Sequence, residues 1–486
     1  MTPNTEHSNG RVPAWFDDAK VGILIHWGSA SMPAYAPVRR SRTLDPYFDG
    51  DLYERVASEA WWRTDPDAMM YQNALHLPGS AVSRYHAENY GDLPYEAFVE
   101  RFRDETIPGW DPDPWTDLFA HAGARYVIFG AKSEDGFLLW PSEHPNPYRE
   151  DWQSERDVVG ELAASVRGRN MRFGIYYPSW DFTFSDPPVS DLTSAMVAVP
   201  QEADYRDQFA AQWRELILRY RPSALWADWG VSPPGTDLAG LYSWYHEQVA
   251  DGLFNDRFDL AEQTAGTLPA DFVTPERTTV PPDDRKWEAL WGLSKSYCFN
   301  RQETEADHIA PTTLIHTMVD VIARGGNMLI NVGPTGSGAI PWAQAQRLLA
   351  VGHWLRLNGA AIYGTRPWTT VAGLSDEGLQ VRYTSTSDAV YAIVLGAPRT
   401  AALGLDLRLD TQAEVRLVGR PGALRTSRSP HGTVVELPEP ADDQVPAFSL
   451  QITPRSAVHH VNHVIDLSAA PGTASLPNRQ PIRTPP

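Results

Sequence analysis

The sequence contains a single cysteine, Cys298, so a disulfide bond within the chain is impossible. A lone thiol suits a reducing compartment. The first twenty residues lack the basic start and the roughly 7–15 apolar residues that secretion requires. No apolar run in the chain is long enough to span a bilayer. These absences predict a cytoplasmic protein that has no membrane partner.

Positive charge is also scarce. The chain has 41 Lys and Arg residues against 61 Asp and Glu residues, which gives a formal net charge of -20. A surface with this excess of carboxylates repels the phosphate backbone of nucleic acids and the head groups of anionic lipids. The charge balance therefore predicts that nucleic acids and membranes are not partners.

Motifs for metal and phosphate chemistry are missing as well. The chain has no HExxH motif, no paired CxxC motif and no GxSxG motif. The stretch GPTGSG, residues 333–338, is rich in glycine but lacks the lysine of a phosphate loop. His459, His460 and His463 have the spacing of one helical face, but Pro, Asp and Ser nearby oppose a helix. The sequence predicts no metal site and no cofactor.

The composition is that of an ordinary globular protein with many aromatic rings. The 486 residues, 42% of them hydrophobic, can bury a large core and predict more than one domain. The 18 Trp and 19 Tyr residues exceed what a typical chain carries. Most of them are expected to pack within the protein, but sugar faces also stack on such rings.

The middle of the chain alternates short apolar runs with longer segments of 3.6-residue periodicity, which predicts a parallel sheet in an α/β fold. A (β/α)8 TIM-like barrel is favoured over a doubly wound sheet because no GxGxxG motif follows the first strand. The expected strands include residues 21–25, 126–131, 173–177, 224–228 and 328–332. The expected helices include residues 115–121, 157–167, 208–220, 238–249, 312–324 and 342–357.

The periodicity changes near Trp368. Several segments alternate apolar and polar residues with period two between turn residues, which predicts a C-terminal antiparallel β-sandwich. The expected division is a catalytic barrel at 1–367, a β-sandwich domain at 368–455 and a flexible tail at 456–486. The tail is rich in Pro, Ser, Ala and Asn, and it could also lie as an arm on a neighbouring copy of a homo-oligomer.

A candidate catalytic acid stands at the end of one expected strand. Residues 223–230 read SALWADWG, and alternation places the side chains of Trp226 and Asp228 on the same face. A barrel enzyme keeps its catalytic groups at this tip of a strand. The alternative, a helix N-cap, is disfavoured because the next expected helix begins only near Leu238. A retaining glycosidase needs such a nucleophile and a second carboxyl group about 5–5.5 Å away, for which Glu276 and Glu288 are candidates.

Six ordered blocks between Trp15 and Trp368 resemble the α-L-fucosidase family of retaining glycoside hydrolases. They read WFDDAKVGILIHWG, ARYVIFGAKSEDGFLLWPS, RDVVGELAASVRGRNMRFGIYYPS, LWADWG, KWEALWGLSKSYCFNR and GGNMLINVGPTGSGAIP. By this resemblance Asp228 is the nucleophile, and the block DFVTPER selects Glu276 as the acid/base. Glu288 is the second choice, with an ion pair or a buried structural carboxylate as its alternative reading, and Asp271 is the third.

The resemblance also implies a sugar pocket. It is expected to contain a set of aromatic and polar side chains at matched positions: His26, Trp27, Tyr177, Trp226, Arg257 and Tyr297. The arginine would hold sugar oxygens through its fixed fork of donors, and the rings would cover the apolar sugar face and a C6 methyl group.

Two departures from the family pattern fall in this pocket. Where the family reads KHHDGF, this chain has KSEDGF, so Ser133 and Glu134 replace two histidines. Where the family reads Glu-Trp-Tyr, the chain has Met69 and Met70 before Tyr71. Thioethers suit a sugar that lacks hydroxyls or carries methyl groups. Glu134 would accept from hydroxyls or pair with an amino group, unless it turns away and leaves a wider pocket.

The sequence therefore predicts a retaining α-L-glycosidase that hydrolyses α-L-fucoside-like or other 6-deoxy or modified sugar glycosides by double displacement. The substrate is a small glycoside, and the chemistry needs no metal or cofactor. The alternatives are a transglycosidase or repurposed barrel acting on a natural-product glycoside, and a non-catalytic carbohydrate-binding homologue.

Overall fold

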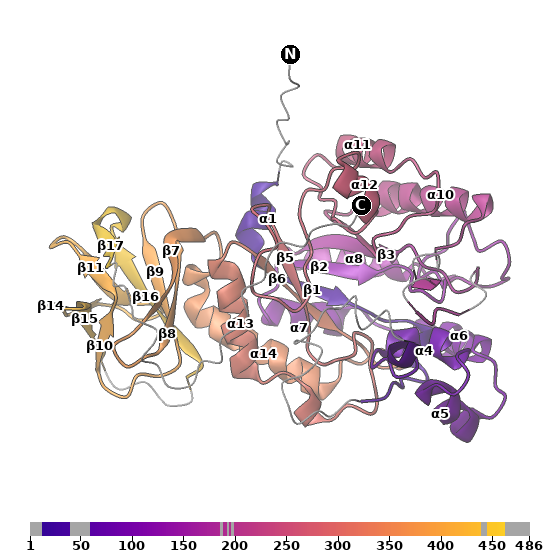
Figure 1. The fold of residues 1–486 in the computed structure, drawn as a ribbon, viewed down its shortest axis with the longest axis horizontal. Helices are drawn as coiled ribbons and strands as arrows, with labels where there is room; N and C mark the ends of the chain where they lie inside the picture. Colours follow the sequence, from indigo (N-terminus) through magenta and orange to yellow (C-terminus); the bar gives the residue numbers. More distant parts are fainter. Residues whose placement is uncertain are drawn as a thin grey trace, which may run out of the picture.

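The computed structural model describes residues 12–38, 59–184, 188–191, 194–195, 199–438 and 445–461. Six of its strands form one parallel sheet: β1 (Val21–Ile25), β2 (Tyr126–Gly130), β3 (Arg172–Pro178), β4 (Leu225–Asp228), β5 (Glu288–Gly292) and β6 (Asn327–Val332). The strand order is β4-β3-β2-β1-β6-β5, and the sheet is curled (Figure 1). The α/β class expected from the sequence is confirmed.

Six strands, and not the eight of the expected barrel, make up this sheet. Three isolated parallel bridges continue from β4 towards β5: Leu225 with Phe254, Asn255 with Phe272, and Val273 with Trp287. The segments that contain Phe254 and Phe272 are too short to form regular strands. Period-two patterning therefore could not reveal them in the sequence.

Helices lie around the parallel sheet (Figure 1). The principal helices are α7 (Asp113–His121), α8 (Val158–Gly168), α10 (Ala203–Tyr220), α11 (Leu238–Gln248), α12 (Leu260–Ala265), α13 (Pro311–Ala323) and α14 (Trp342–Asn358). Further helices are α1 (Ala14–Ala19), α3 (Glu59–Trp62), α4 (Tyr71–Leu75), α5 (Ala81–Tyr90) and α6 (Glu96–Arg101). Single-turn 3₁₀ helices are η1 (Ser29–Ser31), η2 (Ala68–Met70), η4 (Ile107–Gly109), η5 (Glu305–Asp307), η6 (Gly359–Ala361) and η7 (Arg455–Ala457), and η3 (Phe102–Thr106) is a π-helix.

The two faces of the parallel sheet bury different clusters. Alternation along β1 places Val21 and Ile23 in the large cluster that the helices cover, whereas Leu24 lies in a smaller cluster on the concave face. Tyr126, Tyr176, Trp226, Leu290 and Leu329 from the other strands belong to the same inner cluster. Side chains on this inner face at the carboxyl ends of the strands are therefore the ones that reach a common site.

The C-terminal part consists of antiparallel sheets. One has six strands in the order β13-β12-β16-β9-β8-β7, and two smaller sheets have the orders β10-β15-β14 and β11-β17. The strands are β7 (Arg366–Leu374), β8 (Gln380–Ser385), β9 (Val390–Leu395), β10 (Ala402–Leu405), β11 (Leu407–Leu409), β12 (Glu414–Leu417), β13 (Ala423–Leu424), β14 (Thr426–Ser429), β15 (Gly432–Glu436), β16 (Ala447–Thr453) and β17 (Val458–His460). Side chains from all three sheets share one buried cluster.

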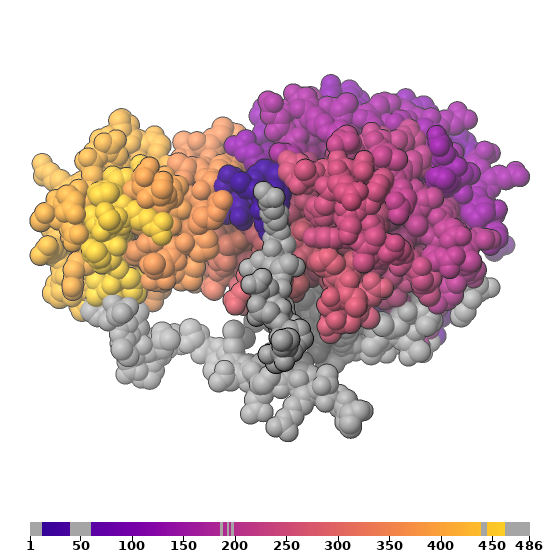
Figure 2. Space-filling model, turned by 90° about the horizontal axis from the view of Figure 1, so that it is seen from above, coloured from indigo at the N-terminus to yellow at the C-terminus, as the bar shows by residue number. Residues whose placement is uncertain are grey.

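Helices α13 and α14 lie between the two parts, which stand side by side in Figure 2. The central strand β9 is buried on both faces: Ala392 faces the C-terminal cluster, whereas Ile393 joins the large cluster around the parallel sheet. The indole N–H of Trp354 in α14 donates a 2.7 Å hydrogen bond to the backbone oxygen of Ala447 in β16. The two parts thus share a packed interface.

Strand β17 falls within the segment expected to be a tail. Its residues His459 and His460 contact Asp410 and Asp406, each at 3.2 Å, and alternate along a strand instead of sharing a helical face. His463 and the rest of 462–486 lie outside the described residues. Within the described ranges no group of three or more His, Cys, Asp or Glu side chains is placed to hold a metal ion. No helix in this part of the chain is long and apolar enough to cross a membrane.

Close packing of α14 on α7 gives a stability prediction. A Cβ atom on Gly352 would lie 1.9 Å from the backbone oxygen of His121, so alanine requires the two helices to separate. We expect Gly352→Ala to lower the free energy of unfolding by about 1–3 kcal/mol or more, measured by urea denaturation. Gly168→Ala is the matched control, because no atom lies within 4 Å of its Cβ position. Equal stability of the two variants would contradict this packing.

Candidate active site

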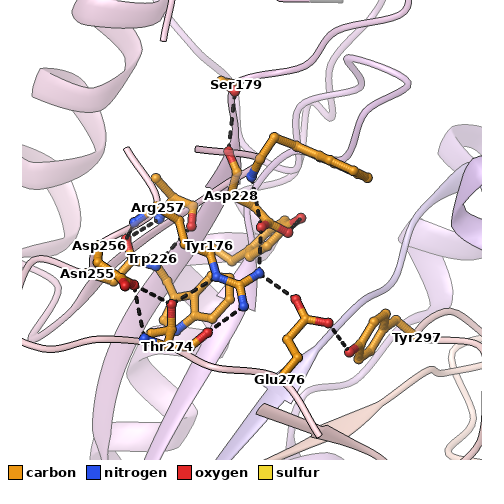
Figure 3. A network of polar contacts seen from close by, with 12 residues as sticks. Tyr176, Ser179, Trp226, Asp228, Asn255, Asp256, Arg257, Thr274, Glu276 and Tyr297 are labelled. Atoms are coloured by element: carbon orange, nitrogen blue, oxygen red, sulfur yellow. Dashed lines mark hydrogen bonds and ion pairs between the residues drawn. The ribbon is translucent and has the colours of Figure 1, made fainter. Parts of the chain in front are cut away.

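Asp228 ends strand β4 at the carboxyl edge of the parallel sheet (Figure 3). Its Oδ2 accepts a 3.0 Å hydrogen bond from the Tyr176 hydroxyl, and its Oδ1 accepts a 2.8 Å bond from the Trp229 backbone N–H. The side chain is 17% exposed. The carboxylate is thus fixed by its neighbours yet accessible, at the edge where parallel α/β folds place catalytic groups.

Two stacked aromatic rings, Trp226 and Tyr176, lie beside this carboxylate. Trp226, two residues earlier on the same face of β4, stacks on Tyr176 with ring centroids 5.6 Å apart. The Arg257 guanidinium lies 4.8 Å from the centroid of the Trp226 ring, which is a cation–π distance. The sequence expectation that Trp226 and Asp228 share one face agrees with this arrangement.

Arg257 joins the two candidate catalytic carboxylates. Its Nη1 donates to Asp228 Oδ1 at 2.9 Å and to Glu276 Oε1 at 2.5 Å (Figure 3). Its Nε donates to Thr274 Oγ1 at 2.9 Å, and Thr274 in turn donates to Asp256. Burial lowers the pKa of Arg257, but the negative charges of Glu276 and Asp228 have the larger effect, so the pKa is raised. The guanidinium is therefore charged and held in one orientation.

This shared donor fixes the spacing of the two acids. Both oxygens lie within hydrogen-bond reach of the same nitrogen atom, so Asp228 Oδ1 and Glu276 Oε1 are closer together than the roughly 6.5–9.5 Å of inverting glycosidases. The geometry is that of retaining enzymes, whose carboxyl groups stand about 5–5.5 Å apart.

Glu276 is held in its ionised form in this state. Burial raises the pKa of Glu276. Arg257, the Tyr297 hydroxyl and Arg277 lower it by more than burial raises it, so the pKa lies below its ordinary value. Tyr297 donates a 2.7 Å hydrogen bond to Glu276 Oε2. The side chain is 32% exposed, which leaves it open to solvent or substrate.

His26 brings a neutral imidazole to the same place. Its Nδ1 lies 2.5 Å from Asn331 Oδ1, and the Asn331 amide N–H is committed to the Tyr297 backbone oxygen at 2.7 Å. Nδ1 therefore carries the hydrogen, and Nε2 is an acceptor without a partner among the described residues. Burial lowers the pKa of His26, although Asn331, Asp67 and Asp228 oppose this. An imidazole in this form can accept a hydrogen bond from a sugar hydroxyl.

Glu134 and Trp229 complete this side of the site. The Trp229 indole N–H donates to Glu134 Oε1 at 2.9 Å, and its ring stacks on Trp180 with centroids 3.7 Å apart. The backbone of Trp229 has φ +73°, a left-handed value that is unusual for a bulky residue and that accompanies functional sites. Ser133 is buried next to Gly28.

Met69 and Met70 lie in η2 and are packed in apolar surroundings. Met69 belongs to a small cluster with Ala36, Ala68 and Cys298, and Met70 belongs to the large core cluster. Their role in sugar binding stays a prediction.

Asp67, which precedes these methionines, is a site residue that sequence reasoning missed. Its Oδ1 caps η2 through the Met69 N–H at 3.0 Å and accepts from the Ser296 hydroxyl at 3.2 Å. Burial raises its pKa, and its charge acts on both His26 and Glu134. An Asp two residues before the family's Glu-Trp-Tyr position was the available signal.

Two predicted pocket residues point away from Asp228. The Tyr177 hydroxyl donates to Gln212 Oε1 at 2.5 Å under α10, because β3 pairs Tyr176, not Tyr177, with Trp226. The Trp27 indole donates to the Thr335 backbone oxygen at 2.9 Å and packs edge-on against Trp115. Both follow an inward-facing residue by one position, so alternation turns them to the outer face.

The second and third choices for the acid/base lie elsewhere. Glu288 is the first residue of β5, at the opposite end of the strands, and its oxygens accept from Tyr126 and, at 3.1 Å, from the Trp226 indole. Burial raises the pKa of Glu288 to about 7, although these two donors lower it. Asp271 is a buried acceptor for Tyr242 at 2.9 Å and for the Phe254 N–H at 2.8 Å. Both fit structural roles.

Comparison with known proteins shows the family of the chain. The sequence profile described as Alpha-L-fucosidase matches residues 1–360. The tissue alpha-L-fucosidase of Bos taurus is 31% identical over 477 residues, which cover 93% of this chain and 91% of that protein. The chain belongs to the α-L-fucosidase family. The structure of Thermotoga maritima alpha-fucosidase in complex with fucose is similar with a TM-score of 0.78 and 33% identity, over 91% of this chain and 97% of that chain.

Membership of the α-L-fucosidase family makes the protein a glycoside hydrolase. The site contains what such an enzyme needs: two carboxylates at retaining distance, an arginine between them and a neutral histidine acceptor beside them.

Proposed function

We propose that the protein hydrolyses α-L-glycosides of fucose-like 6-deoxy sugars with retention of configuration, with Asp228 as the nucleophile and Glu276 as the acid/base. The shared contact of both carboxylates with Arg257 is the observation that carries this proposal. The family relatives, which are named alpha-L-fucosidases, support the sugar class.

In the first step Asp228 attacks the anomeric carbon while Glu276 transfers a proton to the leaving oxygen. This forms the Asp228–sugar ester and breaks the glycosidic bond. In the second step Glu276 removes a proton from water, whose oxygen attacks the anomeric carbon and releases Asp228. The Tyr176 hydroxyl and the Trp229 N–H hold Asp228 in place for attack.

Glu276 must change its environment to act as an acid. A carboxylate bonded to a guanidinium at 2.5 Å is ionised and has no proton to give. A sugar placed between Asp228 and Glu276 separates Glu276 from Arg257 and excludes water, and both changes raise the pKa of Glu276. Arg257 is then free to bind sugar oxygens.

Several finer features of the protein belong to this proposal. The two bridged segments at Phe254 and Phe272 would complete a (β/α)8 barrel, and the antiparallel sheets around one core would form a β-sandwich. The domain boundary would lie between 367 and 368. A lone buried cysteine and the charge of -20 support a cytoplasmic protein that does not bind nucleic acid. A homo-oligomer stays a prediction.

A panel of aryl α-L-glycosides tests the function. It includes the fucoside and 6-deoxy sugars with fewer hydroxyls, and release of the phenol is measured at pH 6–7. We expect turnover of at least one member. Because Glu134, Met69 and Met70 replace polar side chains of the family pattern, less hydroxylated sugars are expected to match or exceed fucose in kcat/KM, each lost hydrogen bond being worth roughly 1–3 kcal/mol. Silence across the panel would contradict the proposed activity.

A further inference from the structure

Glu134 is a buried carboxyl group beside the candidate nucleophile, and it has no role in the double-displacement steps proposed above. It is 0% exposed and follows strand β2. Its Oε1 accepts from the Trp229 indole N–H at 2.9 Å and lies 3.3 Å from the Tyr176 hydroxyl oxygen. Its Oε2 has no hydrogen-bond partner among the described residues. A negative charge on this oxygen would be buried and uncompensated, which is costly.

One hydroxyl hydrogen lies between two carboxyl groups. The Tyr176 oxygen is 3.0 Å from Asp228 Oδ2 and 3.3 Å from Glu134 Oε1, but a phenol has a single hydrogen to donate. Asp228 has the shorter contact and also accepts from Arg257 and the Trp229 N–H, so it is the ionised acceptor. The Tyr176 oxygen must then accept the second hydrogen bond, and only a protonated Glu134 can donate it.

The charged groups around Glu134 favour the protonated form. Its titratable neighbours on other elements are Asp228 from β4, Asp67 from η2, Tyr176 from β3, Tyr205 from α10 and Cys298 after β5. None of these is a cation, and the nearby Lys132 is paired with Asp181 at 3.0 Å. Burial raises the pKa of Glu134 to about 8, with Trp229 opposing and Asp228 and Asp67 adding to the rise.

We propose that Glu134 is a positioning residue that holds a proton in the resting enzyme, donates it to the Tyr176 oxygen, and thereby directs the Tyr176 hydrogen onto Asp228. The proposal rests on the proposed function in one respect, the role of Asp228 as nucleophile. The hydrogen-bond series Glu134–Tyr176–Asp228 requires a carboxyl group at residue 134.

The proposal has a pH consequence with a definite sign. Below pH 8 Glu134 keeps its proton, and Tyr176 donates to Asp228. Above pH 8 Glu134 is ionised, competes for the Tyr176 hydrogen and places a second negative charge near the nucleophile. The attack by Asp228 becomes slower, so kcat/KM falls on the alkaline side.

Glu134→Gln tests this, because glutamine has nearly the shape of a protonated glutamic acid. An amide nitrogen in the place of Oε1 donates to the Tyr176 oxygen at every pH, and the Trp229 indole N–H then loses the acceptor it has in the wild type. We expect the ratio of kcat/KM at about pH 9 to that at about pH 6 to rise roughly tenfold in Glu134→Gln. In a Tyr176→Phe background the same replacement is expected to raise this ratio much less, since the hydrogen-bond link is broken and only the charge of Glu134 still acts on Asp228. An alkaline decline that is identical in wild type and Glu134→Gln would overturn the proposal.

Infrared spectroscopy decides the protonation state without any substrate. The difference spectrum of wild type minus Glu134→Gln is expected to contain the C=O band of a protonated carboxyl group, which disappears as the pH rises through about 8. Wild type minus Glu288→Gln is recorded separately, because that buried group titrates near 7. An ionised Glu134 at pH 6 would refute the proposal. This readout stands even if no glycoside is hydrolysed, so failure of the proposed function is recognised separately.

Discussion

Replacement of Asp228 by alanine is expected to lower kcat/KM for an aryl α-L-glycoside substrate by roughly 10³–10⁵-fold, because the carboxylate that forms the glycosyl ester is removed. The loss should appear in kcat, since the removed interaction forms in the transition state. Initial rates of phenol release measure it. The fold should be preserved, because Asp228 lies at an accessible edge of the sheet.

Azide provides the control for this variant. The space left by the carboxylate admits a small anion, which attacks the anomeric carbon directly and releases a glycosyl azide of inverted configuration. Asp251→Asn is the matched variant, because it removes a half-exposed carboxylate that pairs with Arg172 at the surface. Full activity in Asp228→Ala, or equal losses in both variants, would show that Asp228 is not the nucleophile.

The second large effect concerns Glu276. We expect Glu276→Gln to reduce turnover of glycosides with poor leaving groups by about 10²–10⁴-fold, because these need a proton on the departing oxygen. A dinitrophenyl glycoside, whose leaving group needs little assistance, should lose much less in the first step. Rates across a series of phenols of increasing pKa measure this dependence.

Glu288→Gln is the matched control for that experiment. Glu288 is buried among Tyr126 and Trp226 at the far end of the strands, so its replacement should cost stability, about 1–3 kcal/mol, and change kcat/KM by less than about tenfold. A leaving-group dependence that appears in Glu288→Gln and not in Glu276→Gln would reverse the two assignments.

Much of the site could be predicted from local patterns. Period-two alternation and the end of an apolar run were sufficient to place Trp226 and Asp228 on one face at the edge of the sheet. The resemblance supplied Glu276, Arg257 and Tyr297, which come from segments that have no regular periodicity. Their convergence depends on loops whose course no local pattern encodes.

The structure differs from the expectation where one residue decides which face of the sheet a side chain occupies. Tyr176 and Tyr177 are adjacent, and only the pairing of Tyr176 with Trp226 shows which ring lies beside Asp228. Trp27 follows His26 and turns outward for the same reason. Glu288 could have been set aside from sequence, because it begins its apolar run and catalytic groups of parallel sheets stand where strands end.

The sequence indicated the unusual residues of the pocket but could not show their partners. Glu134 was identified as a replacement for a histidine, with hydroxyl or amine binding as its expected tasks. The structure places its Oε1 against Tyr176 and Trp229, and those contacts depend on three separate strand ends meeting. Burial of this group, which controls its proton, is a tertiary property.

The central claim is that Asp228 forms a covalent bond to the sugar. The most direct test is reaction of the enzyme with a 2-deoxy-2-fluoro-α-L-fucosyl fluoride, followed by proteolysis and mass spectrometry of the peptides. The fluorine at C2 slows both steps, whereas the fluoride leaving group at C1 favours only the first step, so the glycosyl-enzyme intermediate accumulates. We expect one sugar per chain, attached to the peptide that contains Asp228. A sugar attached to Glu134, Glu276 or Glu288 instead would contradict it.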